Sequence, residues 1–196
     1  MKIFTEQKDD HIVINFEPVF VSLNDELSKI NESLVLICAG GYVMQLHGYK
    51  ATADVDAFYK SNAAIEQIIK KVGDAFGINK SDELWLNRSI ANLNPEPPDA
   101  YCKPVYAYSN LEVKAVDMIY LIGMKFVSAR VQDLRDISTI LKHDNNKEPL
   151  VLRATLVDMK FDIDISLLLE AFEAAHGMEW LEHFYRENES ELIQYF

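Results

Sequence analysis

The sequence predicts an α+β protein with α/β-like alternation: a small mixed sheet with flanking helices, followed by a C-terminal helical part. Apolar runs of strand length alternate with helical patterns as far as residue 116. From residue 117 onward the apolar residues follow helical spacing only. We therefore expect a sheet core at residues 1–116 and a helical part at residues 117–196 packed on that core.

The expected core contains one helix with especially clear signals. Apolar side chains recur at helical spacing within Asn62–Phe76, and Gly77 ends the segment. A β-hairpin is expected where two strand-like runs flank Ser109 and Asn110. The expected strands are Leu34–Ala39, Val55–Tyr59, Val105–Tyr108 and Leu111–Ala115, and the other expected helices are Ser22–Glu32 and a short one near Tyr42–His47. Ile12–Phe16 suits either a short strand or part of a mobile start.

The C-terminal part is expected to be a series of helices. A polar break at 143–148 separates an initial helical pair from the rest. Asp164 precedes a run of helix formers and is expected to cap the helix that follows. The expected helices are Asp117–Ala129, Val131–Lys142, Leu150–Lys160, Ile165–His176 and Met178–Gln194.

Composition limits the classes of protein to consider. With 49% hydrophobic and 26% charged residues, the 196-residue chain has the make-up of a globular protein. Its net charge of −12 argues against wide nonspecific binding to nucleic acid. Two cysteines form no disulfide framework, and no apolar stretch reaches the ~20 residues that cross a bilayer. We expect a cytoplasmic protein with no membrane partner.

The most informative segment joins a double glycine to a pair of aspartates. Gly40 and Gly41 end an apolar strand, and Asp54 and Asp56 begin the next. Because side chains alternate along a strand, the two carboxylates are expected to point the same way. Such carboxylates repel unless a positive charge lies between them, and Mg²⁺ (or Mn²⁺) prefers oxygen ligands. This spacing indicates a metal site, whereas the Asp-x-Asp pair alone would also suit solvated acids.

Glycines next to a helix start suit the binding of phosphate. Gly40 and Gly41 allow close backbone approach, and the following helix offers unpaired N–H groups. Lys50 is a candidate contact for a triphosphate and Thr52 a candidate cap of the turn, although both also suit an ordinary polar loop. A phosphate cradle beside metal carboxylates is what phosphoryl transfer requires.

These residues resemble a known family. The order of strand, Gly-Gly, short helix and Asp-x-Asp resembles the nucleotidyltransferase superfold of DNA polymerase beta. The sequence motif from Lys50 to Asp56 is similar to the motif of AbiEii-type toxins and related uncharacterised bacterial nucleotidyltransferases. That branch often has arginine at the position of Lys50. The triplet 85–87 is also similar to that branch, where an acid often follows and this chain has Arg88.

The resemblance implies a third metal-binding acid from a neighbouring strand. Glu112 is the candidate, because it shares a strand face with Lys114 while apolar residues occupy the other face. The alternative is an edge strand with its polar face in water. Asp99 and Asp117 remain rivals for the role.

A second similarity lies in the helical part. The residues Lys125, Arg130, Asp133 and Asp136 resemble the family's Lys-…-Arg-x-x-Asp-hydrophobic-x-Asp segment. The resemblance implies that Lys125 reaches nucleotide phosphates, with Arg130 and Asp133 also at the nucleotide site. Lys125 lies in a nearly all-apolar helix, so it cannot be buried without a partner. The alternative is therefore an ionic link between two helices, which is the interpretation we favour for Asp136.

The sequence thus predicts a metal-dependent enzyme that moves a nucleoside monophosphate from a nucleoside triphosphate to an acceptor hydroxyl. The resemblance implies that the acceptor is tRNA or a protein, and that an antitoxin protein is a partner. Two alternatives stay open. One is a catalytically inactive nucleotide-binding or interaction module of the same fold, and the other is an aminoglycoside-type enzyme acting on a small molecule.

Overall fold

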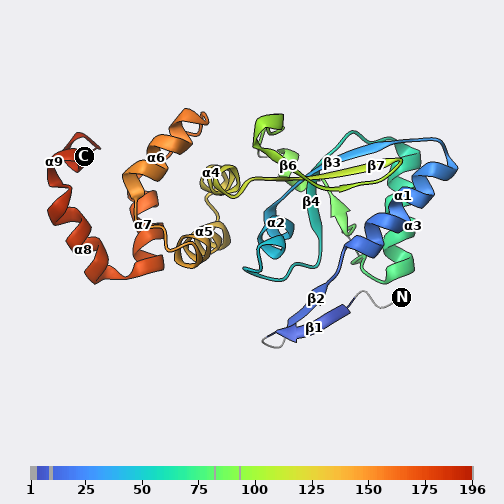
Figure 1. Cartoon of the computed structure of the whole chain (residues 1–196), viewed down its shortest axis with the longest axis horizontal. Coiled ribbons are helices and arrows are strands. Elements are labelled where there is room, and N and C mark those ends of the chain that lie inside the picture. The colour runs from blue at the N-terminus through green and yellow to red at the C-terminus, as the bar shows by residue number, and fades with distance from the viewer. Residues whose placement is uncertain (1–3, 9–10, 82, 93, 196) are drawn as a thin grey trace. The chain divides into compact units, whose positions relative to one another are not determined.

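The chain forms two compact units, residues Met1–Met118 and Ile119–Phe196 (Figure 1). The structure, a computed structural model, describes residues 4–8, 11–81, 83–92 and 94–195, and it describes side chains from residue 13 onward within these ranges. The division lies two residues from the boundary expected at 116. The first unit holds the sheet, and the described part of the second is helical.

A five-stranded mixed sheet organises the first unit. Its strand order is β5-β4-β3-β7-β6. The central strand β3 runs antiparallel to β4 and parallel to β7, while β4 is parallel to β5 and β6 antiparallel to β7. The strands are β3 (Leu34–Ala39), β4 (Val55–Phe58), β5 (Leu86–Asn87), β6 (Cys102–Ala107) and β7 (Leu111–Val116). A separate two-stranded hairpin comprises β1 (Phe4–Lys8) and β2 (His11–Ile14).

Two helices pack together against the sheet. Helix α1 (Glu17–Lys29) contacts α3 (Ala63–Phe76), and their apolar faces join the strands in one hydrophobic core. The expected end of α3 is confirmed, since Gly77 ends the helix with a φ of +66°. At the other end, the Asn62 side chain caps the helix by accepting a hydrogen bond from the backbone N–H of Ile65, a role that the sequence analysis did not assign. Helix α2 (Gly40–Leu46) follows β3 directly and begins two residues earlier than expected.

Helices make up the described part of the second unit. They are α4 (Met118–Ser128), α5 (Val131–His143), α6 (Pro149–Asp158), α7 (Ile165–His176), α8 (Met178–Glu187) and α9 (Glu189–Leu192), with a final 3-10 turn at Ile193–Tyr195. The Asp164 cap is confirmed, since its carboxylate accepts hydrogen bonds from the N–H groups of Ser166 and Leu167. The single helix expected at Met178–Gln194 is wrong, because it breaks at Asn188.

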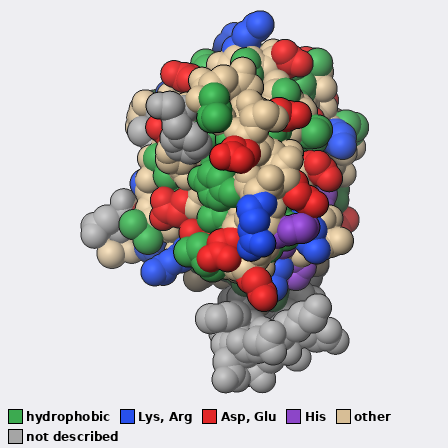
Figure 2. Space-filling view, turned by 90° about the vertical axis from the view of Figure 1, so that its left-hand side faces the viewer, with side chains coloured by type: hydrophobic (Ala, Val, Ile, Leu, Met, Phe, Trp, Pro, Cys, Tyr) green, Lys and Arg blue, Asp and Glu red, His purple; other side chains and the backbone are tan. Residues whose placement is uncertain are grey.

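The predicted mixed α+β class is confirmed, but two strands were not foreseen. Strand β1 lies before the first segment for which the sequence analysis predicted a helix or strand. Strand β5 has only two residues, too few to show the alternation of apolar and polar side chains that marks a strand. Among the described residues, no helix is long and apolar enough to cross a bilayer. The face shown in Figure 2 carries acidic, basic and hydrophobic side chains interspersed rather than a patch of one sign.

Candidate functional site

The backbone of the double glycine lies very close to the side chains of Asp56 and Thr52. Gly40 has a φ of +59°, a conformation that favours glycine. A Cβ atom on Gly40 would lie 2.8 Å from the Oδ2 atom of Asp56, and one on Gly41 would lie 2.6 Å from Oγ1 of Thr52. Only glycines allow this approach. We call Gly40, Gly41, Thr52, Asp54, Asp56 and Ser89 the glycine–aspartate cluster.

Strand register places the aspartates beside the glycine turn. Asp56 on β4 is the cross-strand partner of Ala39, the residue before the turn. Asp54 immediately precedes β4, and its Oδ1 atom accepts a hydrogen bond from the Thr52 hydroxyl at 3.0 Å. The Thr52 backbone N–H donates in turn to Oε1 of Gln45 on α2 at 2.9 Å. The loop that carries Asp54 is therefore tied to the helix that follows the glycines.

Asp56 has a hydroxyl partner of its own. The Ser89 hydroxyl donates to Oδ1 of Asp56 at 2.6 Å, from the start of a short 3-10 helix at Ser89–Asn92. The Oδ1 atom of each aspartate thus accepts a hydrogen bond from a hydroxyl group. The Oδ2 atom of Asp56 lies on the glycine side, where it would meet a Gly40 Cβ.

Lys80 brings a positive charge close to Asp54. Its Nζ atom lies 4.0 Å from Oδ2 of Asp54 and 3.1 Å from Glu83. The hydrogen bond to Glu83 raises the pKa of Lys80, and the charges of Asp54 and Asp56 add to the rise. Both aspartates therefore lie within electrostatic reach of one ammonium group. Its half-exposed position leaves it able to move away from Asp54.

The donor set fits a hard divalent cation. Asp54 and Asp56 supply carboxylate oxygens, and the Asp54 side chain is 25% exposed, so water and a ligand can reach it. Magnesium usually keeps several waters and binds one or two carboxylates together with substrate phosphates. Among the described residues, no group of three or more His, Cys, Asp or Glu side chains could hold a metal ion. The fit is therefore to a two-carboxylate site completed by water or phosphate.

Glu112 does not lie beside the aspartate pair. It is in register with Val35 on β3, four residues before the Ala39 that pairs with Asp56. This offset corresponds to roughly 13 Å along the strand. Instead, Oε1 of Glu112 lies 3.5 Å from Nζ of Lys114, which also bonds to Asp99 at 2.9 Å. The structure thus accounts for Glu112 and its rival Asp99 as partners of a lysine.

The residue that does share a row with Asp56 is Asn87. It lies on β5 in register with Asp56, on the side of β4 away from β3. Asn87, Ser89 and Lys80 were all missed at the sequence level. The triplet ending at Asn87 gave a signal by resemblance, but nothing in the spacing shows that Ser89 returns to Asp56.

A pocket of about 320 Å³ adjoins Asn87 at the β5 edge of the sheet. The guanidinium group of Arg88 lies 5.8 Å from the centre of the Tyr59 ring. This cation–π contact gives the arginine a structural role. The pocket is lined by Tyr59, Glu66, Glu83, Leu84, Leu86, Asn87 and Arg88.

The other expected loop residue, Lys50, lies near the glycines. A Cβ atom on Gly41 would be 3.8 Å from the Cε atom of Lys50. The structure therefore brings Gly40, Gly41, Lys50, Thr52, Asp54 and Asp56 together, as the sequence predicted. The roles expected for them stay predictions.

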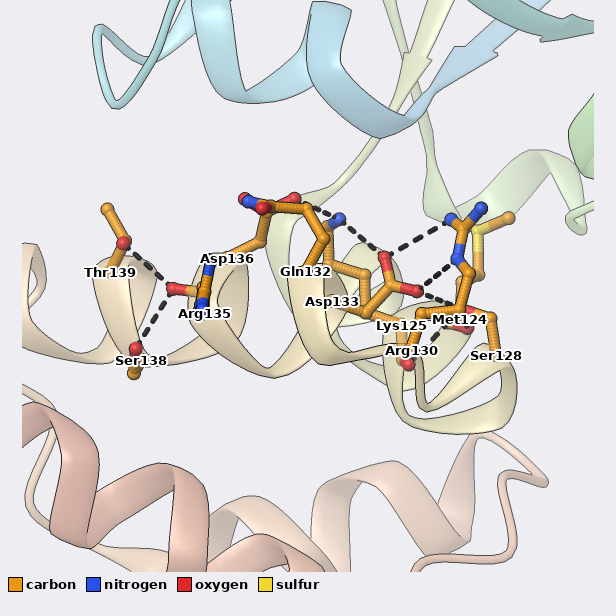
Figure 3. A network of polar contacts seen from close by, with 10 residues as sticks. All are labelled: Met124, Lys125, Ser128, Arg130, Gln132, Asp133, Arg135, Asp136, Ser138 and Thr139. Atoms are coloured by element: carbon orange, nitrogen blue, oxygen red, sulfur yellow. Dashed lines mark hydrogen bonds and ion pairs between the residues drawn. The ribbon is translucent and has the colours of Figure 1, made fainter.

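The second expected segment forms an ionic network, which we call the lysine latch: Lys125, Arg130, Asp133 and Asp136 (Figure 3). The Nζ atom of Lys125 on α4 lies 2.6 Å from Oδ2 of Asp136 and 3.1 Å from Oδ1 of Asp133, both on α5. These three side chains are at most 7% exposed. The ionic link between helices is thus present, and no described contact supports the phosphate role expected for Lys125.

Asp133 contacts Ser128 and Arg130 in addition to Lys125. It accepts hydrogen bonds from Arg130 Nε at 2.7 Å and from the Ser128 hydroxyl at 2.9 Å. Burial by itself raises the pKa of Asp133, but Arg130, the charge of Lys125 and the Ser128 hydroxyl outweigh it, so the pKa lies below its ordinary value. Arg130 and Asp133, expected at a nucleotide site, are here engaged with each other.

Comparison of the chain with protein-family models, with curated proteins and with solved structures gave no match. The case for a function therefore depends on the residues and their geometry.

Proposed function

We propose that this chain is a metal-dependent nucleotidyltransferase with the polymerase-beta nucleotidyltransferase fold, which moves a nucleoside monophosphate from a nucleoside triphosphate to an acceptor hydroxyl. The observation that carries the proposal is the contact between the glycine turn and Asp56. Because a Gly40 Cβ would lie 2.8 Å from Asp56 Oδ2, backbone that can bind phosphate and a carboxylate that can bind metal lie side by side.

The residues of the glycine–aspartate cluster have distinct parts in this proposal. Asp54 and Asp56 hold Mg²⁺ or Mn²⁺, which neutralises charge on the triphosphate and on the leaving pyrophosphate. Gly40 and Gly41 allow the phosphate tail to approach the backbone. Thr52 fixes Asp54 through its hydroxyl, and Lys50 lies close enough to the glycines to meet the same tail. Catalysis then comes from positioning and charge neutralisation.

The proposal has three versions, which differ in the molecule that accepts the nucleoside monophosphate. An RNA such as tRNA, a protein, or a small cationic molecule would each offer a hydroxyl. The acidic residues of the helical part, 10 against 3 basic ones over residues 151–196, favour the cationic acceptor over RNA. In the toxin form of the proposal, an antitoxin protein is the natural partner.

The test is transfer of label from each α-³²P-labelled nucleoside triphosphate, with Mg²⁺ or Mn²⁺, to total RNA, to protein or to aminoglycosides. We expect labelled acceptor with the wild-type chain and a loss of at least about 10²-fold with Asp54→Ala/Asp56→Ala. The matched control is Asp158→Ala/Asp162→Ala, which removes two exposed acids of the helical unit. Equal transfer by wild type and the Asp54/Asp56 variant would refute the proposal.

A second candidate is a nucleotide-binding module without turnover. The observation that favours it is Asn87, which adds an amide rather than a third carboxylate to the row of Asp56. Calorimetric binding of a nucleoside triphosphate with Mg²⁺, abolished in the Asp54/Asp56 variant but without label transfer to any acceptor, would establish this candidate instead.

A further inference from the structure

The Ser89 hydroxyl fixes the orientation of one carboxylate in the glycine–aspartate cluster. It donates to Oδ1 of Asp56 at 2.6 Å, the short distance typical of a hydroxyl bonded to an ionised carboxylate. The other oxygen, Oδ2, is the one that lies against Gly40. With Oδ1 held by Ser89, the carboxylate presents Oδ2 toward the glycine turn.

Ser89 is hydrogen-bonded through its backbone to a residue of the sheet. Its backbone N–H donates to Oδ1 of Asn87 at 3.0 Å, and Asn87 is the β5 partner of Asp56. Strand β5 is anchored by Trp85, which is 1% exposed and whose indole N–H donates to the Ile69 carbonyl at 2.9 Å. The exposed Ser89 is therefore connected through Asn87 to the same sheet that carries Asp56.

We propose that Ser89 is a positioning residue of the metal site, which holds Asp56 so that Oδ2 faces the phosphate cradle. This inference depends on the proposed function, because it assigns Ser89 a part in the same site. A hydrogen bond to a charged group, lost from one metal-binding carboxylate, corresponds to a change in metal affinity of about ten- to a hundredfold. Outer partners of metal ligands have effects of the same size.

A merely structural serine would behave differently. If the hydroxyl served only to start the 3-10 helix at Ser89–Asn92, its removal would lower the melting temperature and leave cation binding unchanged. Cation binding by the otherwise intact protein is therefore the readout that separates the two roles, and no enzymatic activity is required to measure it.

The test is titration of the full chain with Mn²⁺, with free Mn²⁺ followed by electron paramagnetic resonance. We expect Ser89→Ala to weaken Mn²⁺ binding about ten- to a hundredfold and Ser89→Thr to restore it. Ser138→Ala is the matched control, since that serine hydroxyl donates to the backbone carbonyl of Arg135 within α5. If Ser89→Ala does not fold, the isosteric pair Ser89→Thr and Ser89→Val gives the same comparison.

The outcomes separate this inference from the proposed function. Weak binding in Ser89→Ala with wild-type binding in Ser89→Thr supports it. Wild-type affinity in Ser89→Ala or Ser89→Val overturns the positioning role alone, provided that Asp54→Ala/Asp56→Ala abolishes binding. Absence of Mn²⁺ binding by the wild-type chain overturns the metal site and this inference with it.

Asn87 offers a gain-of-function companion to this test. Replacing it with aspartate keeps the oxygen that accepts from Ser89 and exchanges only the Nδ2 group, which is buried without a hydrogen-bond partner. The added carboxylate enters the row of Asp56, so we expect tighter Mn²⁺ binding, by about tenfold, because affinity rises with ligand charge. Weaker binding in Asn87→Asp would contradict the arrangement of Asn87, Ser89 and Asp56 described above.

Discussion

The two units of this chain each hold a pair of aspartates, in opposite surroundings. In the second unit, Asp133 and Asp136 are nearly inaccessible and share the ammonium group of Lys125. In the first unit, Asp54 and Asp56 each accept a hydrogen bond from a hydroxyl, and the Nζ atom of Lys80 lies 4.0 Å from Oδ2 of Asp54. Lys125 and Arg130 thus balance the charges of Asp133 and Asp136, whereas Asp54 and Asp56 retain negative charge at a partly exposed position.

This difference teaches which acidic pairs are candidates for function. A carboxylate pair that is buried with its own cation has a structural task, because breaking it leaves an uncompensated charge. A pair held by neutral hydroxyls beside a glycine turn keeps its charge available to a cation from solution. The Asp-x-Asp motif at Asp162 and Asp164 neither forms a buried ion pair nor lies beside a glycine turn. Instead, Asp164 caps α7.

The largest expected effect concerns the lysine latch. Lys125→Ala leaves Asp133 and Asp136 buried without their ammonium partner, so we expect a loss of about 3–5 kcal/mol in the free energy of unfolding. Urea denaturation followed by circular dichroism measures it. The control is Lys70→Ala, which breaks an exposed pair with Asp74 on α3 and should cost less than about 1 kcal/mol. Equal, small losses in both variants would show that the latch is not structural.

The lysine latch also predicts how stability depends on pH. Because the pKa of Asp133 is lower in the folded protein than its ordinary value of 3.8, its contribution is complete above that value and is lost as pH falls through the folded-state pKa. Unfolding free energies measured from pH 6 to pH 2 should therefore fall more steeply for wild type than for Asp133→Asn. Parallel curves for the two proteins would contradict this assignment.

The glycine turn gives a smaller effect on stability with a distinct effect on the metal site. Gly40→Ala and Gly48→Ala both introduce a side chain at positive φ, and each should cost about 1–2 kcal/mol. Only the first also meets Asp56 Oδ2, since nothing lies within 4 Å of a Cβ on Gly48. Mn²⁺ titration should show weaker binding in Gly40→Ala alone. Equal Mn²⁺ affinity in the two variants would separate the glycines from the metal site.

The smallest expected effect concerns the other Asp-x-Asp sequence. Asp164→Ala removes a helix cap and should cost about 1 kcal/mol in unfolding free energy. Thermal unfolding and Mn²⁺ titration of the same sample should show a lower melting temperature and unchanged metal binding. A loss of Mn²⁺ binding in this variant would mean that the two Asp-x-Asp pairs had been assigned to the wrong roles.

Local signals predicted much of the fold. Gly77 and the apolar spacing before it defined α3, because helix termination and periodicity are properties of neighbouring residues. The glycine turn and Asp56 were joined correctly because a short connection limits how far apart two successive strands can lie. The split after α8 was missed, since Asn188 within a helical pattern is an ambiguous signal.

Long-range register was the main limit on predicting the candidate site. Glu112 was chosen from the polar face of its strand, but the parallel pairing of β7 with β3 sets it opposite Val35. A shift of four residues would have placed it in the row of Ala39 and Asp56, and strand alternation is the same in both registers. Ser89 could not be found by spacing, because its position depends on β5, which spans only Leu86–Asn87.

The central claim, that Asp54 and Asp56 together hold a divalent cation beside the Gly40–Gly41 turn, is tested most directly by anomalous diffraction from crystals soaked in Mn²⁺. We predict an anomalous peak about 2.1 Å from a carboxylate oxygen of each aspartate. A peak elsewhere, or none at this position in crystals that are saturated with Mn²⁺, would contradict the account.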